Sequence, residues 1–379
     1  MAGMSARERV DTAVALGKPD RVPVVPMMDV FAARYAGITQ HQLFFDIEKA
    51  DRAFLKVHEE LGPIDGFNFS NAGSGRLVMA LSIVKPVIPG VDGVDENALW
   101  QFVEKTVMEP GEYANLAQDP DRFMRDKAIA LRDDIKGNFD FYRGKLLGQY
   151  DYLRVLLRAR AWRRRGIEPM VAANFILFPL EQISTQLRSY ADFVTDLYRH
   201  PEEVKEAARA MLKTWFPRCL MGPFISGVKR VFIGLTRTSA SLLSPRQFEE
   251  FALADLMETC EYLVRHGLNP LLHLDNDWTA FFPYFRELPA GKCILNLDGS
   301  SDIFKAKEVL GDRMCIMGDV PAALLKLGTV EEVEAYCERL IREVGDGGGF
   351  ILSSGCDIPI DAKPENVRAM LRSVQKFKP

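Results

Sequence analysis

The stretch NPLLHLDNDWTAFFPYFRELPAGKCILNLDGSSDIFKAKEVLGDRMCIMGD, residues 269–319, decides the fold of this chain. It contains three short apolar runs that each end in an aspartate: PLLHLD (270–275), CILNLD (293–298) and MCIMGD (314–319). Apolar runs of about four to eight residues without polar–apolar alternation are typical of strands buried on both faces of a parallel sheet. We therefore expect parallel strands at these positions, joined by helical crossovers.

Five further apolar runs have the same character. They are VPVVPM (22–27), IDGFNFS (64–70), MVAANF (170–175), RVFIGL (230–235) and FILSSG (350–355). Helical patterns lie between most of them; one has Thr329 as its expected N-cap and Glu332 three residues later, which predicts a capping box. Eight buried strands that alternate with helices indicate an α/β protein with a (β/α)8 TIM barrel. A doubly wound open sheet is the alternative, but no GxGxxG motif follows the first strand.

The spacing of the runs is uneven in one place, because about a hundred residues separate the second run from the third. One crossover helix needs far fewer residues, and long connections usually serve binding or lid functions. We expect one barrel domain over residues 1–379, with residues 71–165 as a cap-like insertion over the barrel mouth.

Composition excludes several classes of protein. The net charge of −4 and the pI near 5.9 do not favour a nucleic-acid partner. No apolar run approaches the roughly 20 residues of a spanning helix, so no membrane association is expected. The cysteines form no CxxC pair, which favours reduced thiols and a cytoplasmic location. The basic run RARAWRRRG (158–166) is interpreted as a solvated helix face; docking of an acidic partner is the alternative.

Polar residues gather at the carboxyl ends of the expected strands, which is where the chemistry of such barrels lies. These residues are Asp29, Asn68, Ser70, Asn174, Arg237, His273, Asp275, Asp298, Asp319 and Cys356. A barrel with a purely structural role has little reason to end most of its strands in such side chains, so we expect an enzyme. Single members can still be turn or cap residues, as Asp319 in GDVP can. A non-catalytic binding subunit is the less favoured alternative.

His273 and Asp275 are two residues apart on one expected strand, so their side chains point to the same face. Cys356 follows the last strand in ILSSGCDIP and can also reach the mouth of a closed barrel. Imidazole, carboxylate and thiolate form a plausible three-ligand zinc set with a fourth position open for substrate. The alternative is a histidine that only hydrogen-bonds its neighbour. Asp277 falls beyond the strand and is expected to cap the segment WTAFFPYF.

The two ends of the chain resemble the uroporphyrinogen decarboxylase superfamily. The likeness rests on RERVDTAVALGKPDRVPVVP near the start and on GDVPAALLKLGTVEEVEAYCERLI and GGGFILSSGCDIPIDAKPENVRAM near the end. It covers essentially the whole chain and is least clear over residues 85–165. The superfamily is built on a (β/α)8 barrel and contains decarboxylases of haem biosynthesis and cobamide-dependent methyltransferases.

The decarboxylase signatures fit poorly. That group has a pair of arginines after the first strand, where MMDVFAARYAGIT offers only Arg34. Its aspartate after an early strand is replaced by FNFSNAG, and its histidine in the C-terminal motif is replaced by Cys356. The methyltransferase branch resembles this chain more closely, since its zinc site is similar to a His-x-Cys at one strand end plus a cysteine in the final SxGC segment. His273 and Cys356 match that pattern, and Asp275 stands in place of the first cysteine.

The resemblance implies a cobamide (corrinoid)-dependent methyltransferase with zinc as Lewis acid. Zinc would be held by His273, Asp275 and Cys356, and the methyl group would pass between the corrinoid and a methoxylated compound, a thiol or a folate. The harder carboxylate ligand favours an oxygen-centred substrate, such as a methoxylated compound, over a thiol acceptor. No DxHxxG cobamide motif occurs in the chain, so the corrinoid would come on a partner protein or free in solution. A homodimer is also possible on this resemblance. The alternative is a metal-free decarboxylase or lyase that acts on a tetrapyrrole or another acidic substrate.

Roles for the remaining strand-end residues complete the prediction. The expected catalytic residues are His273, Asp275 and Asp319. The expected substrate contacts are Asp29, Asn68, Asn174, Arg237 and Asp298. Asp298 as a turn or helix cap, and Arg237 in a structural ion pair, are the alternatives for those two residues.

Overall fold

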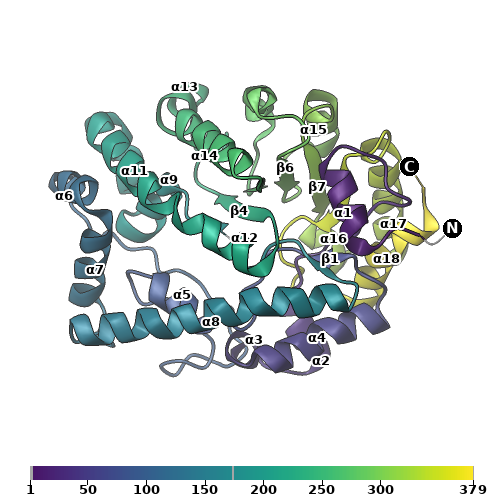
Figure 1. The fold of residues 1–379 in the computed structure, drawn as a ribbon, viewed down its shortest axis with the longest axis horizontal. Helices are drawn as coiled ribbons and strands as arrows, with labels where there is room; N and C mark the ends of the chain where they lie inside the picture. The colour runs from purple at the N-terminus through teal and green to yellow at the C-terminus, as the bar shows by residue number, and fades with distance from the viewer. Residues whose placement is uncertain (1–2, 173–174, 379) are drawn as a thin grey trace.

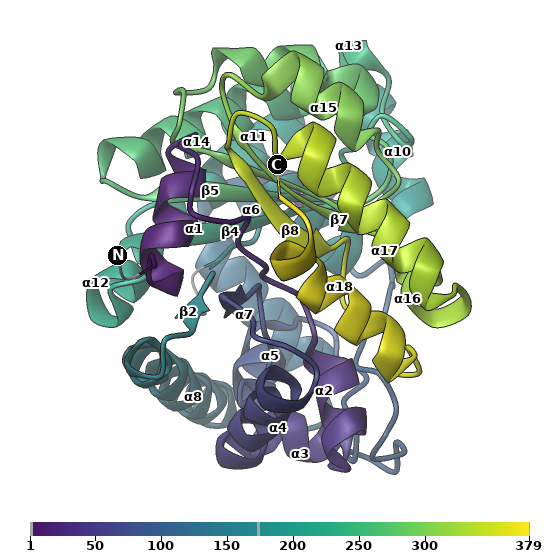
Figure 2. The same ribbon diagram turned by 90° about the vertical axis from the view of Figure 1, so that its right-hand side faces the viewer.

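Parallel strands form the centre of the molecule, and helices surround them (Figures 1 and 2). The computed structural model describes residues 3–172 and 175–378. Six strands form one parallel sheet in the order β3-β4-β5-β6-β7-β8, and β1 pairs with β2 in a parallel two-stranded sheet. The strand bounds are β1 Gly66–Phe67, β2 Glu168–Pro169, β3 Phe175–Ile176, β4 Arg230–Leu235, β5 Asn269–Leu274, β6 Ile294–Leu297, β7 Cys315–Val320 and β8 Phe350–Ser354.

The N-terminal run at residues 22–27 joins the last strand to the first and closes the barrel. Its N–H and carbonyl groups bond to β8, from Val25 N–H to the Leu352 carbonyl and from Leu352 N–H to the Pro23 carbonyl, both at 2.9 Å. On the other side its carbonyl groups accept from the backbone N–H groups of Asp65 and Asn68. Prolines 23 and 26 lack N–H donors, so this run makes isolated bridges in place of a continuous ladder. The expected (β/α)8 TIM barrel is confirmed.

The third expected strand, MVAANF (170–175), is only partly regular. Its place is shared by β2 and β3, which lie on either side of residues outside the described part of the chain. β2 continues the ladder with β1, and β3 pairs with β4 in register from Phe175–Phe232.

Alternation along each strand decides which side chains enter the barrel. In β5, Leu271 packs in the inner cluster with Ile294, Cys315 and Ile351, whereas Leu272 and Leu274 pack toward the outer helices. His273 therefore shares the inward face with Leu271. Helix α1 (Ala6–Val14) packs Val10, Ala13 and Val14 into the same inner cluster, at the end of the barrel away from the strand-end residues.

Helices follow the strands around the barrel. Those outside residues 71–165 are α2 Asp29–Ala36, α3 Gln40–Phe45, α4 Ile47–Glu60, α9 Pro179–Gln182, α10 Tyr190–Arg199, α11 Pro201–Trp215, α12 Met221–Ser226, α13 Pro245–Phe248, α14 Ala254–Arg265, α15 Ile303–Leu310, α16 Ala322–Leu327, α17 Val330–Arg339 and α18 Pro364–Lys376. Shorter or wider helical turns occur at η2 Ile183–Leu187, η3 Arg218–Leu220, η4 Glu249–Leu253, η5 Thr279–Glu287 and η6 Leu340–Val344. The expected capping box is present, because Thr329 and Glu332 bond each other's backbone N–H groups at the start of α17.

Residues 71–165 fold into helices between β1 and β2. They are α5 Gly75–Leu81, η1 Pro110–Glu112, α6 Tyr113–Gln118, α7 Pro120–Leu131 and the long α8 Asn138–Arg164. α8 runs along the lower edge of the molecule in Figure 1 and packs on α5. Gly148 permits this approach, since a Cβ at that position would meet the Ala80 side chain at 2.8 Å. α6 packs against α11, which ties the segment to the body of the barrel.

The sequence led us to expect no membrane-spanning helix and reduced cysteines. Within the described part of the chain, none of the helices has both the length and the apolar character that crossing a bilayer requires. All six cysteines are free thiols; five are buried and Cys356 is partly exposed.

Candidate functional site

His273, Asp275 and Cys356 meet at the carboxyl end of the barrel. His273 Nε2 lies 3.3 Å from Asp275 Oδ1 and 3.8 Å from Cys356 Sγ, and the three ligand atoms all lie within 4.8 Å of one another. His273 lies on β5, Asp275 directly follows that strand, and Cys356 lies in the turn after β8. Gly355 makes that turn possible, because a Cβ there would overlap the backbone of Asp298. The pairing expected from sequence spacing is therefore present in space.

The His273 ring is held by groups behind it. Its Nδ1 lies 2.7 Å from Asn296 Oδ1, and Asn68 Nδ2 donates to the same oxygen at 2.9 Å. An amide oxygen can only accept, so Nδ1 carries the proton and Nε2 presents its lone pair to Asp275 and Cys356 when the ring is neutral. Phe232 stacks on the ring at a centroid distance of 5.2 Å.

Electrostatics couple the three groups. Burial lowers the pKa of His273, but hydrogen bonds and attraction from Asp275 and Cys356 outweigh burial and raise that pKa well above its ordinary value. Burial raises the pKa of Asp275, and the contact with His273 outweighs this and holds the pKa below its usual range. Without a bound cation the site therefore favours an imidazolium–carboxylate pair.

Two of the three separations in the donor set fit a tetrahedral zinc ion, and the Asp275 and Cys356 ligand atoms lie within 4.8 Å of each other. Zinc bonds of about 2.0–2.3 Å imply separations of roughly 3.3 Å between nitrogen and oxygen ligands and roughly 3.6 Å between nitrogen and sulfur ligands. The observed 3.3 Å and 3.8 Å are close to both values. The Asn296 contact to Nδ1 is the outer hydrogen bond that metal-binding histidines commonly make. Three protein ligands leave one position for substrate.

A cavity of about 370 Å³ adjoins this group. Phe232, which stacks on His273, lines it, and so does Thr236, whose hydroxyl donates to Asp275 Oδ2 at 3.0 Å. Aromatic and aliphatic side chains make most of the wall, including Trp100 and Phe102 from the 71–165 segment. A largely apolar pocket with a few polar groups at one end is the usual form of a small-molecule site.

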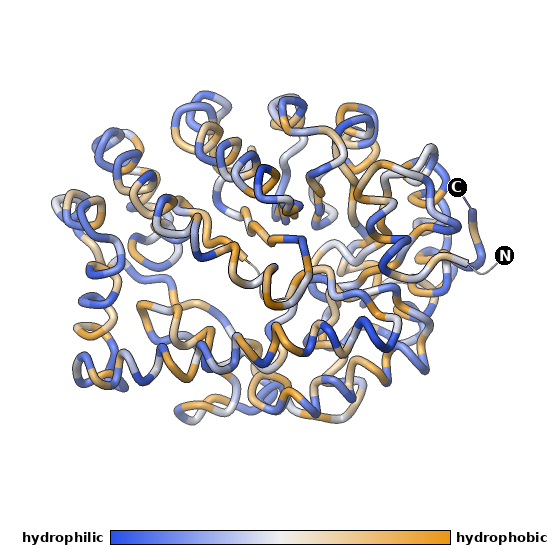
Figure 3. The backbone as a smooth tube through the Cα atoms, viewed as in Figure 1, coloured by the Kyte–Doolittle hydropathy of each residue, from blue (hydrophilic) through white to orange (hydrophobic). Residues whose placement is uncertain are grey.

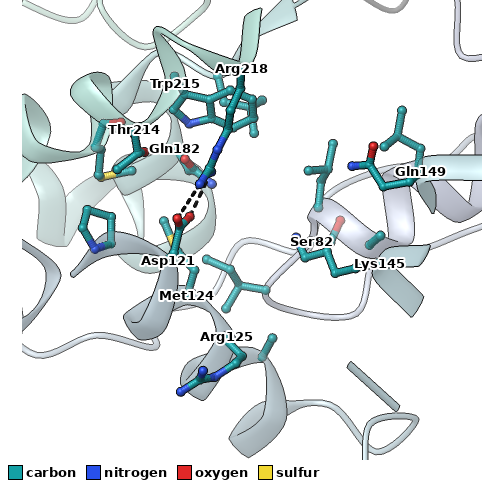
Figure 4. A pocket seen from close by; sticks show the side chains of 18 of the residues that line it. Ser82, Asp121, Met124, Arg125, Lys145, Gln149, Gln182, Thr214, Trp215 and Arg218 are labelled. Carbon is teal, nitrogen blue, oxygen red and sulfur yellow. Dashed lines mark hydrogen bonds and ion pairs between the residues drawn. The ribbon is translucent and has the colours of Figure 1, made fainter. Parts of the chain in front are cut away.

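A second, larger cavity adjoins the first. It has a volume of about 790 Å³ and shares Leu77, Leu81, Phe175, Leu177 and Gln182 with the inner one. Figure 4 shows its polar centre, where Arg218 Nη1 donates to Asp121 at 2.9 Å and Lys145 lies on the opposite side in that view. Burial lowers the pKa of Lys145.

Two of the expected substrate contacts lie beside the His273 group. Asn68 is buried and leaves its Oδ1 without a hydrogen-bond partner. Asp29 opens α2 and accepts from the Asn71 N–H at 2.7 Å. Burial raises the pKa of Asp29 to about 6, and it raises that of Asp357, the residue after Cys356, well above its ordinary value. Repulsion from Asp29 adds to the shift of Asp357, so two buried carboxyl groups adjoin the site.

Other expected residues have structural partners. Arg237 bonds to Glu104 and to the Ser184 carbonyl, as the ion-pair alternative predicts, and it also lines the inner cavity. Asp298 accepts from the N–H groups of Asn276 and Ser300, so it acts as a turn former. Asp277 caps the following segment by accepting from the Thr279 N–H, as expected.

Asp319 stands apart from the His273 group. Its Oδ1 accepts from the hydroxyl of Tyr336 on α17, and burial raises its pKa to about 6. A catalytic role for Asp319 stays a prediction. Asn174 lies outside the described residues. Arg34 is exposed on α2, so its side chain does not line the barrel mouth.

Sequence reasoning missed Asn296, Thr236 and Phe232. Asn296 lies two residues before Asp298 and pairs with His273 in the neighbouring strand. The alternation of side chains along CILNLD therefore could have predicted that Asn296 points into the barrel. No sequence pattern pointed to Thr236 and Phe232, because their contacts with Asp275 and His273 depend on the register between β4 and β5.

Comparison with known proteins places the chain in a family. Residues 182–377, just over half of the chain, match the family described as Uroporphyrinogen decarboxylase (URO-D). The chain belongs to the uroporphyrinogen decarboxylase (URO-D) family. This matched region contains His273, Asp275, Asn296 and Cys356, so the residues that meet at the barrel mouth all come from the family domain.

Individual relatives of this URO-D family member are distant. A uroporphyrinogen decarboxylase of Pseudoalteromonas atlantica is 24% identical over 141 residues, 37% of this chain and 39% of that protein. The enzyme of Methylococcus capsulatus is 33% identical over 91 residues, 24% of this chain and 25% of that protein. The chain thus aligns with about two fifths or less of the length of these relatives.

Among solved structures, a methyltransferase from Methanosarcina mazei has the same fold. The TM-score is 0.70, with 98% of this chain and 99% of that chain covered, at 17% sequence identity. At this identity the likeness concerns the fold.

Proposed function

We propose that this protein is a zinc-dependent methyltransferase that moves a methyl group between a corrinoid and a small molecule held in the strand-end cavity. The observation that carries the proposal is the meeting of His273, Asp275 and Cys356 at separations that suit a zinc ion. The methyltransferase of Methanosarcina mazei, with its shared fold, adds support.

The chain's own residues have distinct tasks in this proposal. His273, Asp275 and Cys356 hold zinc, which supplies Lewis acidity and lowers the pKa of a bound substrate group. Asn296 keeps Nε2 of His273 free to bind. Phe232 and the aromatic wall of the inner cavity exclude water and orient an apolar substrate body. Asp275, in place of a thiolate, gives a harder site that suits an oxygen-centred substrate such as a methoxylated compound.

The corrinoid comes from outside the chain in this proposal, on a partner protein or free in solution. The segment at residues 71–165 supplies part of the wall of both cavities, so we assign to it the role of a cap over the mouth. Asp29, Asn68 and Arg237 are proposed to contact the substrate or the corrinoid at this end.

Metal analysis tests the proposal. Protein purified after zinc-supplemented expression should hold close to one zinc per chain, and His273→Ala and Cys356→Ala should each lose it while remaining folded. The visible spectrum of added methylcobalamin or reduced cobalamin should then change with a suitable methyl acceptor or donor. Protein that holds no zinc under these conditions would refute the metal site; zinc-loaded protein that leaves both cobalamin spectra unchanged with every donor and acceptor would refute methyl transfer.

A metal-free decarboxylase is the second candidate, favoured by the names of the curated relatives. Such an enzyme needs cations to bind an acidic substrate. Arg34 is exposed and Arg237 is already bonded to Glu104, so the described strand ends offer few free cations. Release of carbon dioxide from a carboxylated tetrapyrrole by zinc-free protein would establish this alternative.

A further inference from the structure

The larger cavity offers space that the proposed reaction at the His273 group does not use. Its volume is about 790 Å³, against about 370 Å³ for the inner cavity beside His273. A pocket of about 300–1,000 Å³ is large enough to enclose a small-molecule ligand. Helices α5, α7, α8 and α11 supply most of its wall. Polar and apolar turns alternate along α7 and α8 (Figure 3), and the cavity that they line has both kinds of side chain.

Cations outnumber carboxylates on the wall of the larger cavity. Its charged lining residues are four basic and two acidic side chains: Arg122, Arg125, Lys145, Arg218, Asp119 and Asp121. The three arginines are paired, because Arg218 contacts Asp121 and the other two contact Asp126. Asp119 uses its carboxylate to cap the start of α7. The charge of Lys145 is therefore the one on this wall that no carboxylate pairs with in the described part of the chain.

Lys145 faces the larger cavity from α8 without an anionic partner. Its Nζ lies 5.4 Å from the centroid of the Phe141 ring, and within residues 3–172 and 175–378 it forms neither an ion pair nor a hydrogen bond. Burial lowers the pKa of this amine; attraction from Asp121 offsets part of that effect, and repulsion from Arg218 and Arg132 adds to it. A bound anion would favour the protonated amine, because opposite charges at ion-pair distance stabilise each other.

Gln182 presents a second unused polar group where the two cavities meet. It is 8% exposed and lines both of them. Its backbone N–H bonds to the Phe178 carbonyl, but its side-chain amide has no hydrogen-bond partner among the described residues. In the view of Figure 4 this amide lies near Trp215 and across the cavity from Lys145. Buried polar groups normally have a partner, so an unpaired amide that faces a cavity indicates a hydrogen-bonding atom of a ligand at this position.

We propose that the two cavities together bind one elongated small-molecule carboxylate. Its apolar reacting end lies in the inner cavity beside the His273 group, a hydrogen-bonding atom midway meets Gln182, and its carboxylate pairs with Lys145. The apolar side chains that both cavities share contact the part of the ligand between these groups. One unpaired cation suits the single charge of a carboxylate, whereas a phosphate dianion needs further donors. This inference rests on the proposed function for the reaction itself and names the substrate class of that reaction.

Calorimetry with two matched probes tests the position of the charge. N-benzoyl-γ-aminobutyrate has an aromatic body, a central amide and a carboxylate, and its primary amide replaces the carboxylate by an uncharged group of the same size. The wild type should bind the carboxylate about tenfold more tightly than the primary amide. Lys145→Met should weaken binding of the carboxylate by about 10–100-fold and leave binding of the primary amide unchanged, which also shows that the variant is folded. Lys136→Met is the matched control, because it removes an exposed positive charge just before α8, and it should keep wild-type affinity for both probes.

A second variant tests the meeting point of the cavities. Gln182→Leu should weaken binding of both probes by the same factor, roughly 3–10-fold, because each probe has the central amide. Equal affinity of the wild type for the two probes, absence of binding included, overturns the proposal. A Lys145→Met protein that keeps the preference for the carboxylate overturns it as well.

Tryptophan fluorescence shows whether one ligand fills both cavities. Trp100 lines the inner cavity and Trp215 lines the larger one, whereas Trp162 and Trp278 line neither. The carboxylate probe should change the emission of the wild type, and Trp100→Phe and Trp215→Phe should each lose part of that change. A full signal in either variant means that the ligand leaves one cavity empty, which overturns the elongated arrangement.

These titrations need neither zinc nor a corrinoid, so they separate this inference from the proposed function. A protein that fails the metal test but keeps the preference that depends on Lys145 refutes the proposed function and supports the carboxylate site. A zinc-binding protein without that preference refutes the carboxylate site alone.

Discussion

Replacement of Asn296 by leucine tests how the histidine of the candidate zinc site is held. Asn296 is fully buried, and its Oδ1 accepts from both His273 Nδ1 and Asn68 Nδ2. Leucine has nearly the same shape but no acceptor, so two buried donors lose their partner. Each unsatisfied donor costs about 1–3 kcal/mol, and we expect the free energy of unfolding to fall by roughly 2–4 kcal/mol.

Zinc affinity should fall as well. Loss of the outer hydrogen bond to a ligating histidine typically weakens metal binding by about 10–100-fold, which corresponds to roughly 1.4–2.7 kcal/mol. Competition with a chromophoric zinc chelator measures the dissociation constant, and thermal unfolding of the metal-free protein measures stability. Asn296→Asp is the control, because it keeps an acceptor at the same place and should retain tight binding. A folded Asn296→Leu protein with wild-type zinc affinity would refute the role of Asn296.

The remaining predictions concern Asp275, Asp319 and Arg230. Asp275→Cys should bind zinc at least as tightly as the wild type in the same competition, because thiolate is a favourable zinc ligand; weaker binding would contradict the proposed geometry. Asp319 has a folded-state pKa of about 6 against 3.8 in the unfolded chain, so the folded state keeps this proton to a higher pH. The free energy of unfolding should therefore decrease as the pH rises from 4 to 6, by up to about 3 kcal/mol. Asp319→Asn should remove that decrease in urea titrations at pH 4 and pH 7, and an unchanged pH slope would argue against it. Arg230→Met should lower the free energy of unfolding by about 3–5 kcal/mol in the same assay, because it leaves buried Glu168 with one fewer cation; a loss below about 1 kcal/mol would show that Arg163 alone compensates.

Buried strands were the most predictable part of the fold. The apolar runs from RVFIGL to FILSSG match β4 to β8, because strands covered on both faces leave a dense apolar signal. The run VPVVPM also lies in the barrel, but its two prolines reduce it to isolated bridges. Details that depend on tertiary register, such as the division between β2 and β3, left no local pattern in the sequence.

The candidate site was predictable where it depends on local alternation. His273 lies on β5 and Asp275 directly follows its last residue, so the two-residue spacing places both side chains on one face; the family resemblance supplied Cys356. The partner of Arg237 was not predictable, because Glu104 comes from the long segment before β2 and its position is set by packing. Asn296 could have been found by applying the same two-residue rule to the neighbouring strand.

The closure of the barrel between residues 22–27 and β8 bears on how the protein is synthesised. The first of these segments leaves the ribosome more than three hundred residues before the second. Until β8 emerges, a nascent chain offers His273 and Asp275 but not Cys356, and the seam of the barrel stays open. The ligand set is therefore completed together with the last strand, so an unfinished chain cannot trap zinc with the full set of ligands before its fold is closed.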